Sequence, residues 1–260
     1  MLMFILKSFT GQTKRITLLI TFSFLMCASS FAQGLKVAAA ANLQSVITVL
    51  QKDFKQRTNI DIDPIVGSSG KLVAQIKNGA PYDVFLSADM SFPESLYKDG
   101  LSAKAPVVYA LGNLIICSTK DIGFERWERR LLTPSIKKIA IANPEVAPYG
   151  LAASKLLKKK GILDNVKSKM VYGESISQVN TYITTGVVDV GFTTQALVKD
   201  PANKTKLFWK LIAPKTYAPI QQGLVILKHG ETNLDAERFY NYILSADAKR
   251  IFEQYGYRIQ

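Results

Sequence analysis

The sequence predicts an α/β protein in which strands and helices alternate along the chain. Apolar segments of strand length at 36–41, 60–65 and 84–86 are each followed by a segment with apolar residues at helical spacing. This β-α-β-α-β-α order indicates parallel strands joined by right-handed crossovers. Gly79 and Gly100 stand where two of these helices should end, which supports the same boundaries.

The rest of the chain continues the alternation. Further strands are expected at 107–110, 114–118, 139–142, 169–172, 188–193 and 223–227, and further helices at 127–132, 148–160, 176–185, 235–244 and 246–255. Residues 214–219 contain two prolines and should form a connector between elements.

One turn combines glycine, serine and a helix start. Residues 67–70 read Gly-Ser-Ser-Gly, directly after the strand at 60–65 and before an amphipathic helix. The first turn of a helix leaves backbone N–H groups without partners, and the helix dipole places about half a positive charge there. Ser68 and Ser69 add hydroxyl donors at the same point. We interpret this turn as a cradle for an anion, with an ordinary serine N-cap as the alternative.

The first 32 residues have the pattern of a cleavable signal peptide. Three basic residues precede a short apolar stretch at 16–26, and Ser-Phe-Ala at 30–32 resembles a cleavage site of small residues. We expect cleavage after Ala32 and export to the periplasm. Removing 32 residues from 260 leaves 228, which suits one large domain or two lobes.

Charge and cysteine content narrow the classes of function. Without residues 1–32 the chain keeps 30 of its 33 basic residues against 20 acidic ones, a net charge of about +10. The longest basic run, at 158–160, is too short for a nucleic-acid-binding arm, so we expect no nucleic-acid partner. Cys117 would be the single cysteine left and His229 is the single histidine, so neither an intramolecular disulfide nor a typical structural zinc site is expected.

Four strand-to-helix turns share one design. They are centred on Asn42, Ser69, Tyr149 and Ile176. In open α/β sheets, ligands bind beyond the carboxyl ends of strands, where helices begin. Several helix starts can therefore converge on one anion and donate N–H groups without bringing a full positive charge. Asn42 is also a preferred N-cap residue, so its side chain is expected either to cap the following helix or to face a ligand.

Longer stretches carry a family resemblance. They are Lys-Val-Ala-Ala-Ala-Ala-Asn-Leu at 36–43, Gly-Ser-Ser-Gly-Lys-Leu at 67–72, Asn-Gly-Ala-Pro-Tyr-Asp-Val-Phe-Leu-Ser-Ala-Asp at 78–89, Asn-Pro-Glu through Tyr-Gly at 143–150, and Gly-Glu-Ser-Ile at 173–176. Together they resemble the periplasmic molybdate-binding proteins of ABC importers over essentially all of the chain after residue 33.

The resemblance implies a type II periplasmic binding protein fold. In that fold two α/β lobes are joined by two crossover segments, and the ligand lies in the interlobe cleft. Lobe 1 would hold residues 34–109 and 220–260, and lobe 2 would hold residues 110–219. The proline-containing segment at 214–219 would belong to the second crossover.

The resemblance also implies an oxyanion-binding shell. Motif by motif, it would consist of Asn42, Ser69, Tyr149 and Ile176, with Ala41, Ser68 and Thr194 as weaker candidates. Ser69 would contribute its hydroxyl and its N–H, and Ile176 only its N–H. Many relatives have serine in place of Asn42, some have alanine in place of Tyr149, and some have tyrosine in place of Thr194. Whether the side chain of Tyr149 joins its backbone in the shell is left open.

The expected function is capture of molybdate, and of tungstate as well, for delivery to the membrane permease of an ABC importer. A fully deprotonated tetrahedral dianion needs donors only, and no aspartate stands at the centre of the four turns. Phosphate near neutral pH keeps a proton and usually needs an acceptor, so it fits less well. Molybdenum would be held only as the oxyanion, with no direct protein ligand to a metal ion. We expect no cofactor, and we expect the protein to be a monomer.

Two other functions are weighed against this one. The first is a receptor for sulfate or another tetrahedral oxyanion on the same fold. The second is a secreted enzyme with Ser69 as nucleophile, which would need a general base within reach. His229 is expected at the surface, and Asp83 and Asp89 are expected to make turn and cap contacts around a short strand. We therefore expect no enzyme.

Overall fold

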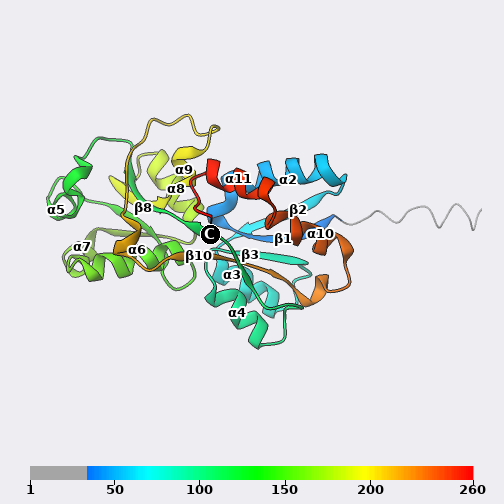
Figure 1. The fold of residues 1–260 in the computed structure, drawn as a ribbon. Coiled ribbons are helices and arrows are strands. Elements are labelled where there is room, and N and C mark those ends of the chain that lie inside the picture. Colours follow the sequence, from blue (N-terminus) through cyan, green and yellow to red (C-terminus); the bar gives the residue numbers. More distant parts are fainter. Residues whose placement is uncertain (1–33, 260) are drawn as a thin grey trace, which may run out of the picture. The chain divides into compact units, whose positions relative to one another are not determined.

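Two five-stranded sheets organise the protein, in a computed structural model that describes residues 34–259 (Figure 1). The first sheet has the order β2-β1-β3-β10-β4 and the second the order β7-β6-β8-β5-β9. Strands of the first sheet are β1 (Leu35–Ala40), β2 (Ile62–Gly67), β3 (Val84–Ser87), β4 (Val107–Gly112) and β10 (Ile220–Ile226); strands of the second are β5 (Leu114–Ser118), β6 (Ile139–Ala142), β7 (Met170–Gly173), β8 (Val190–Thr194) and β9 (Phe208–Leu211). The signal peptide predicted at 1–32 lies outside the described residues.

Both sheets are mixed rather than wholly parallel. Strand β1 pairs in parallel with β2 and β3, which confirms the predicted crossovers of the first half. Strand β10, however, runs antiparallel to β3 and β4, and β5 runs antiparallel to β8 and β9. The chain passes from the first sheet to the second after β4 and returns through β10. We propose that the two sheets form the two predicted lobes, with the limits given above.

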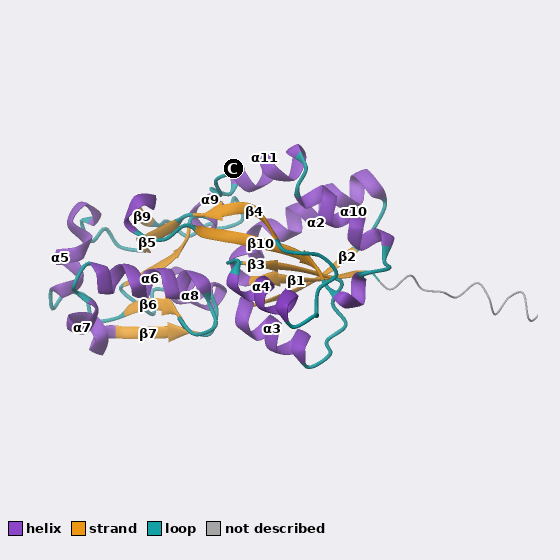
Figure 2. Cartoon of the chain, turned by 60° about the horizontal axis from the view of Figure 1, so that its bottom comes forward, coloured by secondary structure: helices purple, strands orange, loops and turns teal. Residues whose placement is uncertain are grey.

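Helices cover both faces of the first sheet (Figure 2). They are α2 (Gln44–Thr58), α10 (Leu234–Ile243) and α11 (Ala246–Gln254) on one face, and α3 (Ser69–Lys77) and α4 (Ser91–Lys98) on the other. Successive side chains of a strand point to opposite faces. Accordingly, Val37 and Ala39 pack in the cluster with α2, whereas Ala38 packs in the cluster with α3.

Helix α2 shows how the sequence specifies these contacts. Its apolar residues at helical spacing, Val46, Ile47, Leu50 and Phe54, are buried. The helix ends at Asn59, which adopts the left-handed conformation at φ 59° that asparagine tolerates better than most residues. The predicted apolar face of this helix is therefore confirmed.

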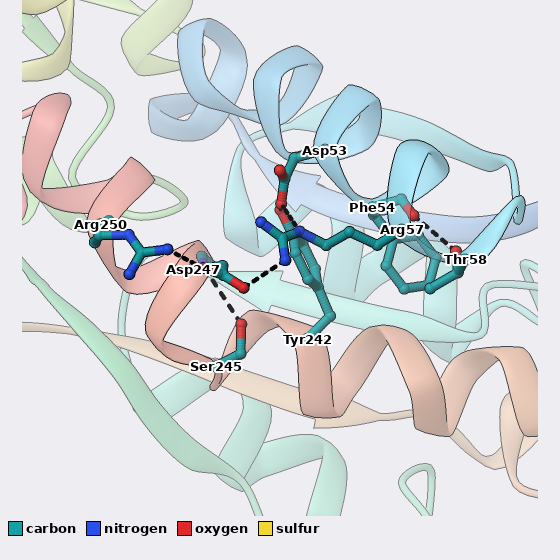
Figure 3. Close-up of polar contacts among 9 residues, drawn as sticks. Asp53, Phe54, Arg57, Thr58, Tyr242, Ser245, Asp247 and Arg250 are labelled. Carbon is teal, nitrogen blue, oxygen red and sulfur yellow. Dashed lines mark hydrogen bonds and ion pairs between the residues drawn. The ribbon is translucent and has the colours of Figure 1, made fainter.

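The C-terminal helices are tied to α2 by a polar cluster (Figure 3). The carboxylate of Asp53 accepts hydrogen bonds from Arg57 Nε at 2.7 Å and from the hydroxyl of Tyr242 at 2.8 Å. Arg57 also pairs with Asp247, which pairs in turn with Arg250. These contacts fix α10 and α11 to α2, so the end of the chain packs on the same face of the first sheet as its first helix.

Between β5 and β9 the chain forms the helices α5 (Trp127–Leu132), α6 (Pro148–Lys159), α7 (Leu163–Val166), α8 (Ile176–Thr184) and α9 (Ala196–Lys199). Within residues 34–259 the 3₁₀ helices are η1 (Ala41–Leu43), η2 (Phe124–Arg126), η3 (Lys167–Lys169), η4 (Pro214–Thr216) and η5 (Lys228–Gly230). The sequence predicted neither α7, α9 nor β9. Among the described residues, no helix has the length and apolar character needed to cross a membrane.

Candidate functional site

Six of the seven predicted ligand-binding residues line one small cavity. Its walls include Ala41, Asn42, Ser68, Ser69, Tyr149 and Ile176. The cavity volume is about 10 Å³, which is about the room that one water-sized group needs. The seventh residue, Thr194, does not line the cavity. Its Oγ1 donates a hydrogen bond of 3.3 Å to the hydroxyl of Tyr149, which does.

The cavity is built from four helix starts. Asn42 lies in η1 directly after β1, and Ser69 is the first residue of α3 after β2. Tyr149 is the second residue of α6 and Ile176 the first of α8, both after strands of the second sheet. The first turn of each helix has N–H groups without partners in that helix. Two donor sets, one from each sheet, therefore face the same small volume.

The side chain of Asn42 is held by Gln222, a residue that the sequence analysis missed. Gln222 Nε2 donates to the backbone oxygens of Ala88 and Ile220, both at 3.1 Å, so its Oε1 must face the other way. That oxygen accepts from Asn42 Nδ2 at 2.8 Å. Gln222 is fully buried in β10. The only sequence signal is a pair of glutamines just ahead of apolar strand residues.

Tyr257 completes the contacts of the Asn42 amide. Asn42 Nδ2 donates to the hydroxyl of Tyr257 at 2.9 Å, and that hydroxyl donates to the backbone oxygen of Asn42 at 2.8 Å. Both amide hydrogens of Asn42 are therefore used, and its Oδ1 is buried without a protein partner among the described residues. The side chain does not cap the helix, contrary to one of the two expectations, because it is turned to Gln222 and Tyr257. Its available donor is the backbone N–H.

Ser69 presents a hydroxyl that is oriented by its neighbour. Its Oγ accepts a hydrogen bond from the backbone N–H of Ala88 at 3.0 Å, so the hydroxyl hydrogen is free to donate elsewhere. The residue is 1% exposed. Ser68 is also buried, and its Oγ has no partner among the described residues. Ser68 occupies the N-cap position of α3, as the alternative expected, but its side chain makes no capping hydrogen bond.

The side chain of Tyr149 extends from the cavity to the end of β4. Its hydroxyl lies against Gly112, where a Cβ atom would stand 2.1 Å from the phenol oxygen. Glycine at that position is therefore required by the tyrosine ring. Burial raises the pKa of the Tyr149 phenol well above its ordinary value, with nearby Tyr257 acting in the same direction. The phenol is thus neutral and keeps its hydrogen for donation.

Ile176 lines the cavity at the start of α8. Its side chain is buried in the core of the second sheet, together with Val179 and Ile183. The preceding Ser175 caps α8, since its Oγ accepts from the N–H of Gln178 at 3.3 Å. This cap fixes the first turn of the helix. Ile176 therefore lines the cavity from the first position of a capped helix.

The cavity brings together donors but no charged side chains. None of its lining residues is acidic or basic, and the part of the chain at 34–259 has no group of three or more His, Cys, Asp or Glu residues that could hold a metal ion. His229 Nδ1 contacts Asp83 Oδ1 at 2.9 Å, and neither residue lines the cavity. Asp89 accepts from Ser91 Oγ and from the N–H of Phe92, which is the expected cap chemistry. Such a site can bind an anion, but its walls contain no general base beside Ser69.

Comparison with known proteins gives a consistent relationship. Residues 35–258 match the family model described as bacterial extracellular solute-binding protein. The chain is 33% identical to molybdate-binding protein ModA of Azotobacter vinelandii over 247 residues, covering 95% of this chain and 98% of that one. It is 31% identical to the protein of the same name from Rhodobacter capsulatus over 223 residues, covering 85% and 86%.

A solved structure agrees with these relatives. The fold matches the periplasmic molybdate-binding protein of Azotobacter vinelandii with a TM-score of 0.82 at 33% identity. The match covers 87% of this chain and 99% of that chain. The expected type II periplasmic binding protein fold, with two α/β lobes, is thereby confirmed.

Proposed function

Because this chain belongs to the family of bacterial extracellular solute-binding proteins, we propose that it captures molybdate in the periplasm and delivers it to the membrane permease of an ABC importer. Tungstate, which has nearly the same size and the same charge, is a second ligand. The protein acts as a monomer after its signal peptide is removed, and it needs no cofactor.

The observation that carries this proposal is the convergence of four helix starts on one uncharged cavity. A tetrahedral dianion accepts hydrogen bonds at every oxygen, and the cavity offers backbone N–H groups and the hydroxyl of Ser69. Helix starts attract anions through their free N–H groups and their dipoles. Asn42, Ser69, Tyr149 and Ile176 form the ligand shell in this proposal.

In this proposal the other three predicted residues support the ligand shell. Ala41 contributes backbone at the start of η1, and Ser68 contributes a second buried hydroxyl. Thr194 holds the hydroxyl of Tyr149 rather than the anion.

The proposed role is binding rather than catalysis. Nucleophilic catalysis by Ser69 needs a base that takes its proton. Its Oγ instead accepts a backbone N–H from Ala88, and no carboxylate or imidazole lines the cavity. A comparison of ester hydrolysis between the wild-type protein and Ser69→Ala tests this point. Serine-dependent hydrolysis would contradict the binding role.

Two other anions have to be separated from molybdate. Sulfate carries the same charge and is the alternative ligand on this fold. A protonated anion such as hydrogen phosphate would be favoured if the unpaired Oδ1 of Asn42 accepted a hydrogen bond from the ligand. Both anions therefore belong in the binding experiment.

The experiment is a thermal-shift series with molybdate, tungstate, sulfate and phosphate. A ligand that binds only the folded protein stabilises it by about 2.7 kcal/mol when its concentration is a hundred times its Kd. We expect large shifts with molybdate and tungstate and small ones with sulfate and phosphate. A shift with phosphate alone would assign the pocket to a protonated oxyanion and contradict the proposal.

A further inference from the structure

The two donor sets of the cavity touch each other directly at Gly70. This residue is the second of α3, on the side of the first sheet, and its N–H donates to the backbone oxygen of Val146 at 2.9 Å. Val146 lies in the turn between β6 and α6, on the side of the second sheet. An N–H in the first turn of a helix has no partner within that helix, so it is available for this contact.

The contact leaves no room for a side chain at position 70. A Cβ atom on Gly70 would stand 2.9 Å from Val146 Cα and 3.0 Å from Val146 Cβ, with Phe92 Cζ at 3.1 Å. The nearest of these atoms belongs to the backbone, which cannot turn aside as a flexible side chain can. Any side chain at position 70 would therefore keep the two turns farther apart.

The ligand shell surrounds this contact closely. Ser69 directly precedes Gly70, and Tyr149 follows Val146 by three residues. A second contact also joins the two sides: Lys71 Nζ lies 2.6 Å from Glu174 Oε2, in the turn before α8. Both side chains of that pair are more than half exposed, so solvent screens it and it adds little. The two halves also meet where Ala40, Ala41 and Ala88 pack in the core cluster of the second sheet, but between the turns at 67–70 and 143–147 the backbone contact is that of Gly70 with Val146.

We propose that Gly70 is the closure stop of the binding site, in the sense that its contact with Val146 sets the smallest distance between the donor sets. The inference rests on the proposed function. The cavity volume of about 10 Å³ is too small for a tetrahedral anion to enter unless the two halves separate and then close around it by a hinge motion. The backbone of Gly70 meets that of Val146 at the end of this motion. The missing side chain at position 70 therefore fixes the size of the closed cavity and selects anions large enough to reach both donor sets.

The variant Gly70→Ala tests the inference. In the open protein the added methyl group no longer meets Val146, but Phe92 of the same half still stands 3.1 Å away and must shift slightly. Alanine is the better helix residue, which offsets this cost, so the unliganded variant should be close to the wild type in stability. In the closed protein the methyl group acts as a wedge. We expect molybdate to bind about tenfold more weakly or worse, as for other overpacked contacts. The N–H of residue 70 is retained, so the loss of affinity does not come from a missing hydrogen-bond donor.

Three measurements on wild-type and variant protein decide the matter. They are calorimetric titration with molybdate, thermal unfolding without ligand, and small-angle X-ray scattering at saturating molybdate. Saturated Gly70→Ala should keep a larger radius of gyration than the saturated wild type. Gly67→Ala is the matched control, because a Cβ there meets Leu72 of its own half at an ordinary 3.4 Å, and it should lose less affinity than Gly70→Ala.

Each outcome has a separate meaning. If the wild-type protein does not bind molybdate, the proposed function fails and Gly70 is not in question. If the wild type binds but Gly70→Ala binds equally tightly or reaches the same radius of gyration, Gly70 is not a closure stop. Thermal unfolding without ligand measures the separate cost of the methyl group against Phe92, and weaker binding that only matches a general loss of stability would also contradict the inference.

Discussion

The side-chain oxygen of Gln222 accepts a hydrogen bond of 2.8 Å from the side-chain nitrogen of Asn42, and this contact joins strand β10 to the turn after β1. Because β10 is the strand through which the chain returns to the first sheet, the contact links a crossover segment to a cavity wall. Asn42 is thereby held so that its backbone N–H, rather than its amide group, is the donor available to a ligand.

The variant Gln222→Glu tests this arrangement with almost no change in shape. A carboxylate would place an oxygen against the backbone oxygens of Ala88 and Ile220, where Gln222 now donates two hydrogen bonds. Leaving buried polar groups unpaired costs about 1–3 kcal/mol each. We expect a lower free energy of unfolding and weaker molybdate binding, measured by urea unfolding and titration calorimetry. Wild-type stability together with wild-type affinity would show that Gln222 does not position Asn42.

The hydroxyl of Ser69 should contribute directly to affinity. Ser69→Ala removes one hydrogen bond to a charged group, worth about 1.5–3 kcal/mol, which corresponds to roughly tenfold to hundredfold weaker binding. It also leaves the N–H of Ala88 without its acceptor. Titration calorimetry of Ser69→Ala measures the loss, and an unchanged Kd would remove Ser69 from the shell.

Ser68→Ala is the companion variant. Ser68 Oγ is buried without a protein partner among the described residues, so its removal breaks no hydrogen bond within that part of the fold. A loss of affinity without a loss of stability would place this hydroxyl on the ligand. An unchanged affinity would assign it to the cavity wall only.

Ile176 should serve the ligand through its backbone alone. Ile176→Val keeps the N–H and removes one methylene group from the buried core. We expect nearly unchanged affinity and a cost of about 0.5–1.5 kcal/mol in the free energy of unfolding. Calorimetry and urea unfolding measure the two quantities separately. A large loss of affinity at preserved stability would mean that the side chain contacts the ligand.

Periodic apolar spacing was sufficient to predict most of the fold. Helix α5 and strand β6 have the predicted bounds, and the helix starts at Ser69 and Ile176 follow the strands from which they were predicted. Strand β9 was missed because it is a four-residue edge strand whose alternate residues are exposed, so its pairing with β5 leaves little local signal. Strand β10 begins at Ile220 rather than at 223, since its first residues pair with β4 through backbone groups that any side chain allows.

The binding site was predictable only in part, for a related reason. A strand followed by a helix start is a local pattern, and this pattern identified the residues that line the cavity. Gln222 and Tyr257 reach Asn42 across 180 and 215 positions of the chain. Only the folded arrangement of the strands brings such residues together, so local spacing gives no indication of the contact. The use of both amide hydrogens of Asn42 was unpredictable for that reason.

The polar cluster of Figure 3 should make stability depend on pH in the acid range. The hydrogen bond from Arg57 holds the pKa of the Asp53 carboxyl below its ordinary value, against the opposing effect of burial. A lowered pKa in the folded state means that the stabilisation is fully present above the unfolded pKa of about 3.9 and is lost as pH falls through the folded pKa. Because the carboxylate is partly exposed, we expect a small effect.

Asp53→Asn isolates this contribution. Its free energy of unfolding should fall less steeply than that of the wild type as pH decreases from about 5 to 2, since the group that gains the proton is absent. Urea unfolding of both proteins across this range measures the difference. Parallel pH profiles would show that the ion pair with Arg57 does not contribute.

We predict that the protein distinguishes molybdate from sulfate by size. Sulfate and molybdate carry the same charge and present the same acceptors, so neither charge nor donor number separates them. Sulfate is smaller because sulfur–oxygen bonds are shorter than molybdenum–oxygen bonds. Donors fixed on helix starts, and held apart at Gly70, cannot follow a smaller anion inward. Each poorly satisfied buried donor costs about 1–3 kcal/mol, so two or three of them give a discrimination of several kcal/mol, which is about thirtyfold at the low end and far more at the high end.

Competition calorimetry with molybdate and sulfate tests the central claim most directly. The protein is titrated with molybdate in the presence of sulfate at a comparable concentration, and the apparent Kd is compared with that in its absence. We predict the same apparent Kd in both titrations, and the same independence of sulfate for tungstate. Displacement of molybdate by sulfate at comparable concentration would contradict the molybdate assignment and identify the protein as a general receptor for tetrahedral oxyanions.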